Sequence, residues 1–323
     1  MRIAILDDYQ GAALETADWS PVASRADITV FGDHLADPAA LIDRLEPFDV
    51  ICVMRERTPL PREVLESLPR LRLIASTGPR NSSIDVNATA ALGIEVMHTG
   101  YFSEPTVEHT WALILAALRR VVAEANSVRA GGWQTGVGVD LAGKTLGLLG
   151  LGNIGGRVAR IGQAFGMHTI AWSQNLTAER AKELGAARVE PEELFSRSDV
   201  LSVHLILSER TRGLVGAPQL ALMRPDAWLI NTSRGPIVDE AALLDALRQG
   251  RLAGAAIDVF GTEPLAADHP FRSQPNLLAT PHVGYVTENL YRTFYGDTAR
   301  NIADWLARAG PSTFGEGPAA RRA

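Results

Sequence analysis

The sequence predicts an α/β protein with two doubly wound parallel sheets. Short apolar runs rich in Val and Ile alternate with helical stretches in two series, one within the first hundred residues and one from Lys144 onward. Strand–helix alternation of this kind is typical of a parallel sheet covered by helices on both faces. The 323 residues, 46% of them hydrophobic, suffice for two domains with separate cores.

The first series contains five expected strands separated by helices. The intervening stretches PAALIDRL and PREVLESL have helical spacing and begin with proline, which is favoured in the first helical turn. The expected strands are Ile3–Leu6, Ile28–Val30, Val50–Val53, Leu73–Ala75 and Ile94–Val96.

A single long helix is expected from Glu104 to Arg129, with Ser103 as its N-cap and the pair Gly131-Gly132 beyond its end. The first half of this helix is apolar almost all the way round, so it must be buried on several sides. A position between domains or between subunits would account for that burial.

The second series predicts a six-stranded sheet, followed by a helix from about Thr287 to Ala309 that returns to the first domain. We expect a first domain made of residues 1–100 and 287–323, and a second domain of residues 101–286. The six expected strands lie in TLGLLG, HTIAW, VLSVHLIL, AWLINTS, GAAIDVF and NLLAT.

The composition argues against several classes of protein. The net charge is −6 and the pI about 5.7, whereas a nucleic-acid surface needs clustered Lys and Arg. The longest apolar run, Trp111–Leu118, is too short to span a bilayer. Cys52 is the only cysteine, so no internal disulfide can form and a reducing compartment is expected. We therefore expect a cytoplasmic protein that binds neither nucleic acid nor membranes.

A glycine motif follows the first strand of the second series. The stretch LGLLGLGNIGGRVARIGQAFGM contains Gly150-x-Gly152-x-x-Gly155 between an apolar run and a helix. In this context the three glycines allow a tight turn, close approach to a pyrophosphate and close helix packing, in that order. The amides of Asn153 and Ile154 then face the phosphates from the helix N-terminus. The alternative is a glycine-rich turn without a ligand.

Ser173 occupies the position that would contact the ribose of a bound dinucleotide. An Asp or Glu is expected there for NAD, and an Arg nearby for NADP, about twenty residues after the motif. The sequence IAWSQN contains neither, and the nearest arginine is Arg180. NAD and NADP are therefore both open, with NAD weakly favoured.

Three further polar residues follow expected strands of the second sheet. Arg234, Glu263 and His282 stand in LINTSRGPIVD, IDVFGTEP and ATPHVGY, and the carboxyl ends of parallel strands share one edge, where ligands bind. An arginine can grip a carboxylate with two parallel hydrogen bonds, and a histidine can carry a proton. Taken singly, they could be a surface arginine paired with Asp239, a solvated glutamate and a turn histidine. Their common edge favours an active site.

Four motifs, in this order and spacing, resemble those of the D-isomer-specific 2-hydroxyacid dehydrogenases, the group that includes phosphoglycerate dehydrogenase and glyoxylate/hydroxypyruvate reductase. They are GLGNIGGRVARIGQAFGM, LINTSRGPIVDEAALLDAL, GAAIDVFGTEPL and LLATPHVGY. The resemblance covers Ile3 to Leu306 and implies a Rossmann domain inserted in a flavodoxin-like substrate domain. It also implies that Arg234, Glu263 and His282 are catalytic. The expected cofactor-binding residues are Gly150, Gly152, Asn153, Ile154, Gly155, Ser173, Thr232 and Asp258, the last near the nicotinamide carboxamide.

The expected substrate loop departs from the family pattern. The family carries GxGxDxID, whereas this chain has TGPRNSSID, with Arg80 and Ser82 in place of a Gly and an Asp. The stretch VMRERTPL resembles one in which phosphoglycerate dehydrogenases carry phosphate-binding arginines, which makes Arg55 and Arg57 candidates; exposed loop arginines are the alternative. The expected substrate-binding residues are Thr77, Gly78, Arg80, Asn81 and Arg55.

The resemblance implies hydride transfer between NAD(P)H and a small 2-oxo or D-2-hydroxy acid, with the carboxylate on Arg234 and on the backbone around Thr77–Asn81 between the domains. Two alternatives are an NAD(H)-sensing co-repressor with the same fold, and phosphoglycerate dehydrogenase specifically. Formate dehydrogenases pair a glutamine with the histidine, so Glu263 argues against them. A homodimer built on the helix from Glu104 is expected, and no metal site.

Overall fold

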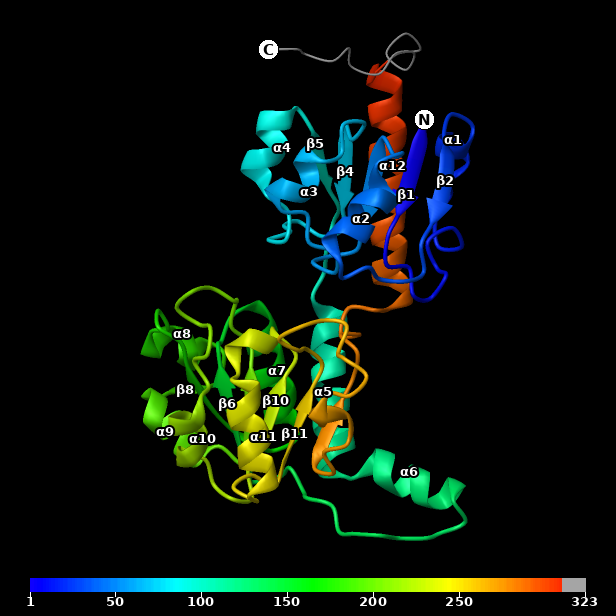
Figure 1. The fold of residues 1–323 in the computed structure, drawn as a ribbon. Coiled ribbons are helices and arrows are strands. Elements are labelled where there is room, and N and C mark those ends of the chain that lie inside the picture. The colour runs from blue at the N-terminus through cyan, green and yellow to red at the C-terminus, as the bar shows by residue number, and fades with distance from the viewer. Residues whose placement is uncertain (310–323) are drawn as a thin grey trace. The chain divides into compact units, whose positions relative to one another are not determined.

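The computed structural model describes residues 1–309, which form two compact units (Figure 1). The first unit consists of Met1–Phe102 together with the chain from Val286, and the second of Ser103–Tyr285. The first unit is therefore assembled from both ends of the chain.

The first unit contains a sheet of five parallel strands in the order β2-β1-β3-β4-β5, which is the order of flavodoxin-like folds. Two of its three inner strands, β3 and β4, are buried at every position, as expected where helices cover both faces. All five strands were predicted, with ends that differ by at most two residues. They are β1 (Arg2–Ile5), β2 (Asp27–Val30), β3 (Val50–Val53), β4 (Leu73–Ser76) and β5 (Glu95–His98).

The helices of the first unit include the last helix of the described chain, which packs against α1, β4 and β5. The prediction that this helix returns to the first sheet is confirmed. Asp37 caps α2 by accepting a hydrogen bond from the Ala40 amide, and Asp85 caps α4 in the same way from Asn87 and Ala88. The helices are α1 (Ser20–Ala23), α2 (Pro38–Leu45), α3 (Arg62–Glu66), α4 (Val86–Leu92) and α12 (Glu288–Ala309).

The second unit contains a sheet of seven parallel strands in the order β12-β11-β10-β9-β6-β7-β8. Counted from β6, its first six strands have the Rossmann order 3-2-1-4-5-6, and β12 adds a seventh at the edge. Six of the seven were predicted. The prediction missed β8, which has only two residues and both of them exposed. The strands are β6 (Thr145–Leu149), β7 (His168–Trp172), β8 (Ala187–Arg188), β9 (Val200–Val203), β10 (Trp228–Asn231), β11 (Gly254–Ile257) and β12 (Leu277–Ala279).

Helices cover both faces of this sheet and enclose two hydrophobic cores. One core lies under α5, α7 and α8 and includes Trp111, Ile114 and Val158; the other lies under α9, α10 and α11 and includes Leu194 and Leu247. The helices are α5 (Glu104–Leu118), α6 (Val121–Arg129), α7 (Asn153–Ala164), α8 (Ala178–Glu183), α9 (Pro191–Arg197), α10 (Ala217–Leu222) and α11 (Glu240–Arg248), with 3-10 turns η1 (Gly235–Ile237) and η2 (Pro270–Arg272).

The prediction of one continuous helix from Glu104 to Arg129 is wrong. The chain breaks after Leu118, and Arg120 adopts a left-handed conformation with φ 55° before α6 begins. The returning segment fixes the break, because the Val139 amide donates to the Leu118 carbonyl at 2.9 Å. Ser103 precedes α5 but makes no side-chain cap; its Oγ accepts from Asn153 Nδ2 at 2.9 Å instead.

No helix in residues 1–309 combines the length and the apolar character that a bilayer span requires. The predicted cytoplasmic location stays a prediction.

Candidate active site

The predicted site residues of the second unit lie at one edge of its sheet. Gly150 follows β6, Arg234 follows β10, Asp258 follows β11 directly and His282 follows β12. These strands are parallel and lie in the order β12-β11-β10-β9-β6. Residues from four separate parts of the sequence therefore meet at the carboxyl edge, beside the point between β6 and β9 where the strand order reverses, which is where open α/β sheets bind ligands.

The glycine motif has the geometry that a dinucleotide pyrophosphate requires. Gly150 has φ +103°, and a Cβ there would meet the His204 carbonyl carbon at 2.8 Å. A Cβ on Gly155 would stand 2.1 Å from the Gly150 carbonyl oxygen, so only glycine lets α7 pack this close to the loop. By contrast, a Cβ on Gly152 would meet nothing within 4 Å, which leaves space over the loop. Helix α7 begins at Asn153, so its first amides face that space, and the loop fits a dinucleotide.

His204 lies against this loop. It directly follows β9, and its Nε2 lies 2.8 Å from Ser202 Oγ. Desolvation by the surrounding chain lowers the pKa of His204 to about 4, so the imidazole is neutral at physiological pH. A neutral histidine therefore supports the turn at Gly150.

Glu263 and His282 form a close pair. Glu263 Oε2 lies 2.6 Å from His282 Nδ1, and Glu263 Oε1 accepts a hydrogen bond from the Phe260 amide at 2.9 Å. The Tyr285 ring packs edge-on against the imidazole, with ring centroids 5.3 Å apart. Both side chains of the pair stay partly exposed, at 22% for His282 and 30% for Glu263. Because Nδ1 is engaged with the carboxylate, Nε2 is the nitrogen that can exchange a proton with a ligand.

Arg234 stands at the same edge, between β10 and the turn η1. One of its guanidinium nitrogens, Nη1, donates to the Ser233 carbonyl at 2.8 Å. The loop before it is held by Ser233 Oγ, which donates to the Leu205 carbonyl, and by Asn231, whose carboxamide oxygen accepts from the Ser233 amide at 3.0 Å. Asp239, the alternative ion-pair partner of Arg234, caps α11 by accepting a hydrogen bond from the Ala242 amide.

Asp258 is buried and its carboxylate is engaged by the turn that carries His282. It accepts hydrogen bonds from Thr280 Oγ1 at 2.6 Å and from the amides of Val283 and Gly284 at 2.9 and 2.8 Å. His109 Nε2, from helix α5, lies 3.3 Å from the same carboxylate. Sequence reasoning missed His109 and Thr280. A single histidine in the apolar first half of α5 was the one available signal for His109.

Two other predicted cofactor residues lie nearby in the same unit. The hydroxyl of Thr232 is 2.7 Å from that of Thr110 on α5, and both residues are buried. Ser173 follows β7, and its carbonyl accepts from the Leu176 amide at 3.0 Å. These contacts stabilise the loops that follow β10 and β7.

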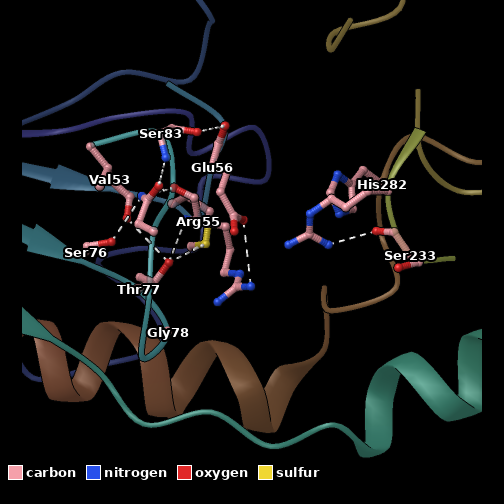
Figure 2. A network of polar contacts seen from close by, with 12 residues as sticks. Val53, Arg55, Glu56, Ser76, Thr77, Gly78, Ser83, Ser233 and His282 are labelled. Atoms are coloured by element: carbon pink, nitrogen blue, oxygen red, sulfur yellow. Dashed lines mark hydrogen bonds and ion pairs between the residues drawn. The ribbon is translucent and has the colours of Figure 1, made fainter. Parts of the chain in front are cut away.

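In the first unit, most of the predicted substrate residues meet at the carboxyl ends of β3 and β4. Arg55 has a left-handed backbone with φ 53°. Its amide donates to Thr77 Oγ1 at 2.8 Å (Figure 2), and its carbonyl accepts from Asn81 Nδ2 at 2.6 Å. The Gly78 amide donates to Thr99 Oγ1 at 2.7 Å. The side chains of Thr77 and Asn81 thus hold the Arg55 loop in place.

The basic residues of this unit differ in their surroundings. The Arg55 guanidinium lies over the Tyr101 ring and 3.7 Å from Glu56. Arg57 donates to the Asp7 carbonyl at 2.7 Å. Arg80, by contrast, is exposed. No group of three or more His, Cys, Asp or Glu residues within 1–309 is arranged to hold a metal ion.

Comparison with known proteins places these features in a family. Residues 111–284 match the model of the D-isomer specific 2-hydroxyacid dehydrogenase, NAD binding domain. Glyoxylate reductase of Aeropyrum pernix is 48% identical over 235 residues, which is 70% of each chain. The chain belongs to the D-isomer specific 2-hydroxyacid dehydrogenase family. The resemblance seen in the sequence is thereby confirmed.

Solved structures of dehydrogenases of this kind have the same fold along nearly the whole chain. A phosphoglycerate oxidoreductase from Vibrio cholerae superposes with a TM-score of 0.91 at 38% identity, covering 96% of this chain and 100% of its own. A D-lactate dehydrogenase from Aquifex aeolicus complexed with NAD and lactic acid superposes with a TM-score of 0.76 at 26% identity, covering 95% and 96%. This dehydrogenase is therefore an oxidoreductase that uses NAD and acts on CH–OH donors of the 2-hydroxy acid class or on the corresponding 2-oxo acids.

Proposed function

We propose that this dehydrogenase reduces small 2-oxo acids to D-2-hydroxy acids, with Arg234, Glu263 and His282 as its catalytic residues. The observation that carries the proposal is the 2.6 Å pair of Glu263 and His282, at the same sheet edge as the glycine loop of the second unit. Bound NADH supplies the hydride that C2 of the substrate receives. The remaining task of the protein is to deliver one proton to the oxygen on C2 and to hold the carboxylate.

His282 is suited to deliver that proton. Its Nδ1 contacts Glu263, so a proton on Nε2 is available for the oxygen on C2, and the ionised carboxylate stabilises the imidazolium that precedes transfer. The Phe260 amide holds the other oxygen of Glu263, which fixes the plane of the pair. In the direction of oxidation the same nitrogen accepts the hydroxyl proton.

Arg234 is suited to hold the carboxylate. A guanidinium offers a planar fork that matches the two oxygens of a carboxylate, and the grip also fixes the carbonyl relative to the hydride donor. The Asn231 and Ser233 contacts hold the backbone from which this arginine extends. Together, the carboxylate grip and the proton carrier define a 2-oxo acid as the substrate class.

We propose that the preferred substrates lack a phosphate group. Arg55 and Arg57, the candidate phosphate ligands, already contact Glu56 and the Asp7 carbonyl, respectively. A phosphate would have to compete with those contacts for the two guanidinium groups. The similarity to the glyoxylate reductase of Aeropyrum pernix also favours a small acid such as glyoxylate. The substrate-binding roles of Thr77, Gly78, Arg80 and Asn81 stay predictions.

The test is steady-state NADH oxidation with a panel of 2-oxo acids, with and without a phosphate. We expect turnover of the small acids, and a fall in kcat of about a hundredfold or more in His282→Ala, the usual contribution of a general acid. His168→Ala serves as the control, because His168 is exposed at the start of β7. A protein that binds NADH but turns over none of the acids would instead be an NAD(H) sensor acting through partners. Faster turnover of the phosphorylated acid would identify a phosphoglycerate dehydrogenase.

We also propose a homodimer formed through α6 and the segment after it. This part projects from the body of the second unit (Figure 1) and exposes Val128 at 59%, Trp133 at 76% and Val137 at 94%. A second copy is the partner that would cover such an apolar surface in a protein of this family. Sedimentation should give twice the chain mass, and the double variant Trp133→Ser/Val137→Ser should give a monomer. Val86→Ser, an exposed valine on α4, should leave the dimer intact; a monomeric native protein would contradict the proposal.

A further inference from the structure

The turn that carries His282 has an unfavourable backbone conformation. His282 has φ 52°, in the left-handed region, although it is not a glycine. A side chain in that region crowds the backbone, so contacts elsewhere must hold the turn in place. Within the turn, the His282 amide donates to the Thr280 carbonyl at 3.0 Å. That single contact spans only two residues and cannot by itself fix the direction of the imidazole.

Asp258 restrains the backbone of this turn, while Glu263 contacts the imidazole itself. The two Asp258 oxygens accept from the amides of Val283 and Gly284, the two residues immediately after His282, and from the hydroxyl of Thr280, two residues before it. One carboxylate thus grips the turn on both sides of the histidine. Burial alone would raise the pKa of Asp258, but the hydrogen bonds from His109, Thr280 and the Val283 amide outweigh it and lower the pKa below its usual value. Asp258 is therefore ionised, and charged acceptors make the stronger hydrogen bonds.

His109 completes the group from helix α5. Its Nε2 lies 3.1 Å from Thr280 Oγ1 and 3.3 Å from Asp258 Oδ1. The Thr280 hydroxyl gives its only hydrogen to Asp258 at 2.6 Å, and an ionised carboxylate has none to give. The hydrogen between His109 and these oxygens must therefore sit on Nε2 of His109. Most residues of helix α5 between Pro105 and Leu118 are buried, so this donor comes from a fixed element.

We infer that His109, Thr280 and Asp258 form a clamp that holds the left-handed turn at His282 in its working orientation, which makes the three residues positioning residues for proton transfer. The inference rests on the proposed role of His282. It assigns Asp258 a structural role, since its carboxylate oxygens are contacted by four donors of the chain itself. It also couples the proton carrier to helix α5, whose sequence lies about 170 residues earlier.

Gly284 shows how little room the clamp leaves. A Cβ at this position would stand 2.9 Å from Asp258 Oδ2 and 3.5 Å from His109 Cδ2. Only a residue without a side chain lets the 284 amide reach the carboxylate while His109 stays in place. The glycine in the sequence ATPHVGY is thus explained by the clamp, because no positive φ is required there.

The test compares variants that remove one donor with variants that keep it. Thr280→Val and His109→Leu each remove a hydrogen bond to the clamp, whereas Thr280→Ser and His109→Gln retain a donor. We expect kcat for 2-oxo acid reduction to fall about tenfold or more in the first pair, the effect of one lost hydrogen bond to a charged group. We expect KM and the NADH dissociation constant to change less than about threefold. The conservative pair should recover most of kcat.

Matched controls separate a clamp from a general loss of stability. Thr169→Val removes a comparable hydroxyl, which donates to the Gly185 carbonyl at 2.8 Å away from this edge, and His168→Leu removes an exposed histidine. Both should keep the native kcat. Unchanged kcat in Thr280→Val and His109→Leu would overturn the clamp, and so would failure of Thr280→Ser to recover activity. Near-native turnover of His282→Ala would instead contradict the proposed function. That outcome can be told apart from a failure of the clamp, because the clamp variants leave His282 in place.

Discussion

His204 should make the folded protein sensitive to mild acid. Its pKa falls from 6.5 to about 4 because the chain around it excludes water. Above pH 6.5 the histidine is neutral in both the folded and the unfolded chain, so it has no effect on stability. As the pH falls from 6.5 toward 4, His204 binds a proton in the unfolded chain but stays neutral in the folded chain. The free energy of unfolding therefore decreases across this interval and changes no further below it.

The size of this loss follows from the shift. A difference of about 2.5 pH units corresponds to about 3 kcal/mol at 1.36 kcal/mol per unit, which is the limit reached below pH 4. At pH 5 the expected loss is about 2 kcal/mol, because the unfolded histidine is then almost fully protonated and the folded one is not. Because His204 is half-buried, these figures are upper bounds.

The assay is urea unfolding followed by tryptophan fluorescence at pH 7 and pH 5, compared between the native chain and His204→Gln. Carboxylates also lose stabilising contacts in acid, but they do so equally in both proteins, so the difference between the two isolates His204. The native chain should lose about 2 kcal/mol more than the variant. His168→Gln, at an exposed position, should behave like the native chain. Equal losses in the native chain and His204→Gln would refute the reasoning.

Three further predictions concern the cofactor and the substrate. Gly155→Ala should lower the thermal stability, because its Cβ would stand 2.1 Å from the Gly150 carbonyl oxygen. Gly152→Ala should fold normally but bind NADH more weakly, as measured by calorimetry. Equal thermal stability of the two variants would contradict this view of the loop. With Ser173 at the ribose position, we expect NADH to be preferred over NADPH by less than about a hundredfold in kcat/KM, and Ser173→Asp to increase that preference. A thousandfold preference for NADH in the native enzyme would show that Ser173 does not determine the choice of cofactor. Arg234→Lys should raise KM and lower kcat together, because the charge remains but the planar fork is lost, and an unchanged kcat/KM would remove Arg234 from the substrate site.

The sequence by itself determined the class of fold and the sheet edge at which the candidate site residues lie. Strands buried on both faces of a parallel sheet appear as continuous apolar runs, so β3, β4, β9 and β10 were evident from local composition. The glycine motif was evident because its constraints are local. Gly155 faces the Gly150 carbonyl five residues earlier, Gly150 faces His204 at the end of the neighbouring strand β9, and Gly152 leaves space over the loop. Arg234, Glu263 and His282 could be assigned to one edge because the carboxyl ends of parallel strands always meet there.

Only the tertiary structure decided features that depend on residues far apart in the chain. Strand β8 has two exposed residues and exists because β7 offers it hydrogen bonds. The helical pattern continues through Arg120, and the break there depends on the returning segment at Val139. The engagement of Asp258 by His109 joins a helix and a strand end through a fold that places α5 against β10 and β11. A linear pattern encodes which residues are buried, but the partners of a buried polar group depend on which elements become neighbours.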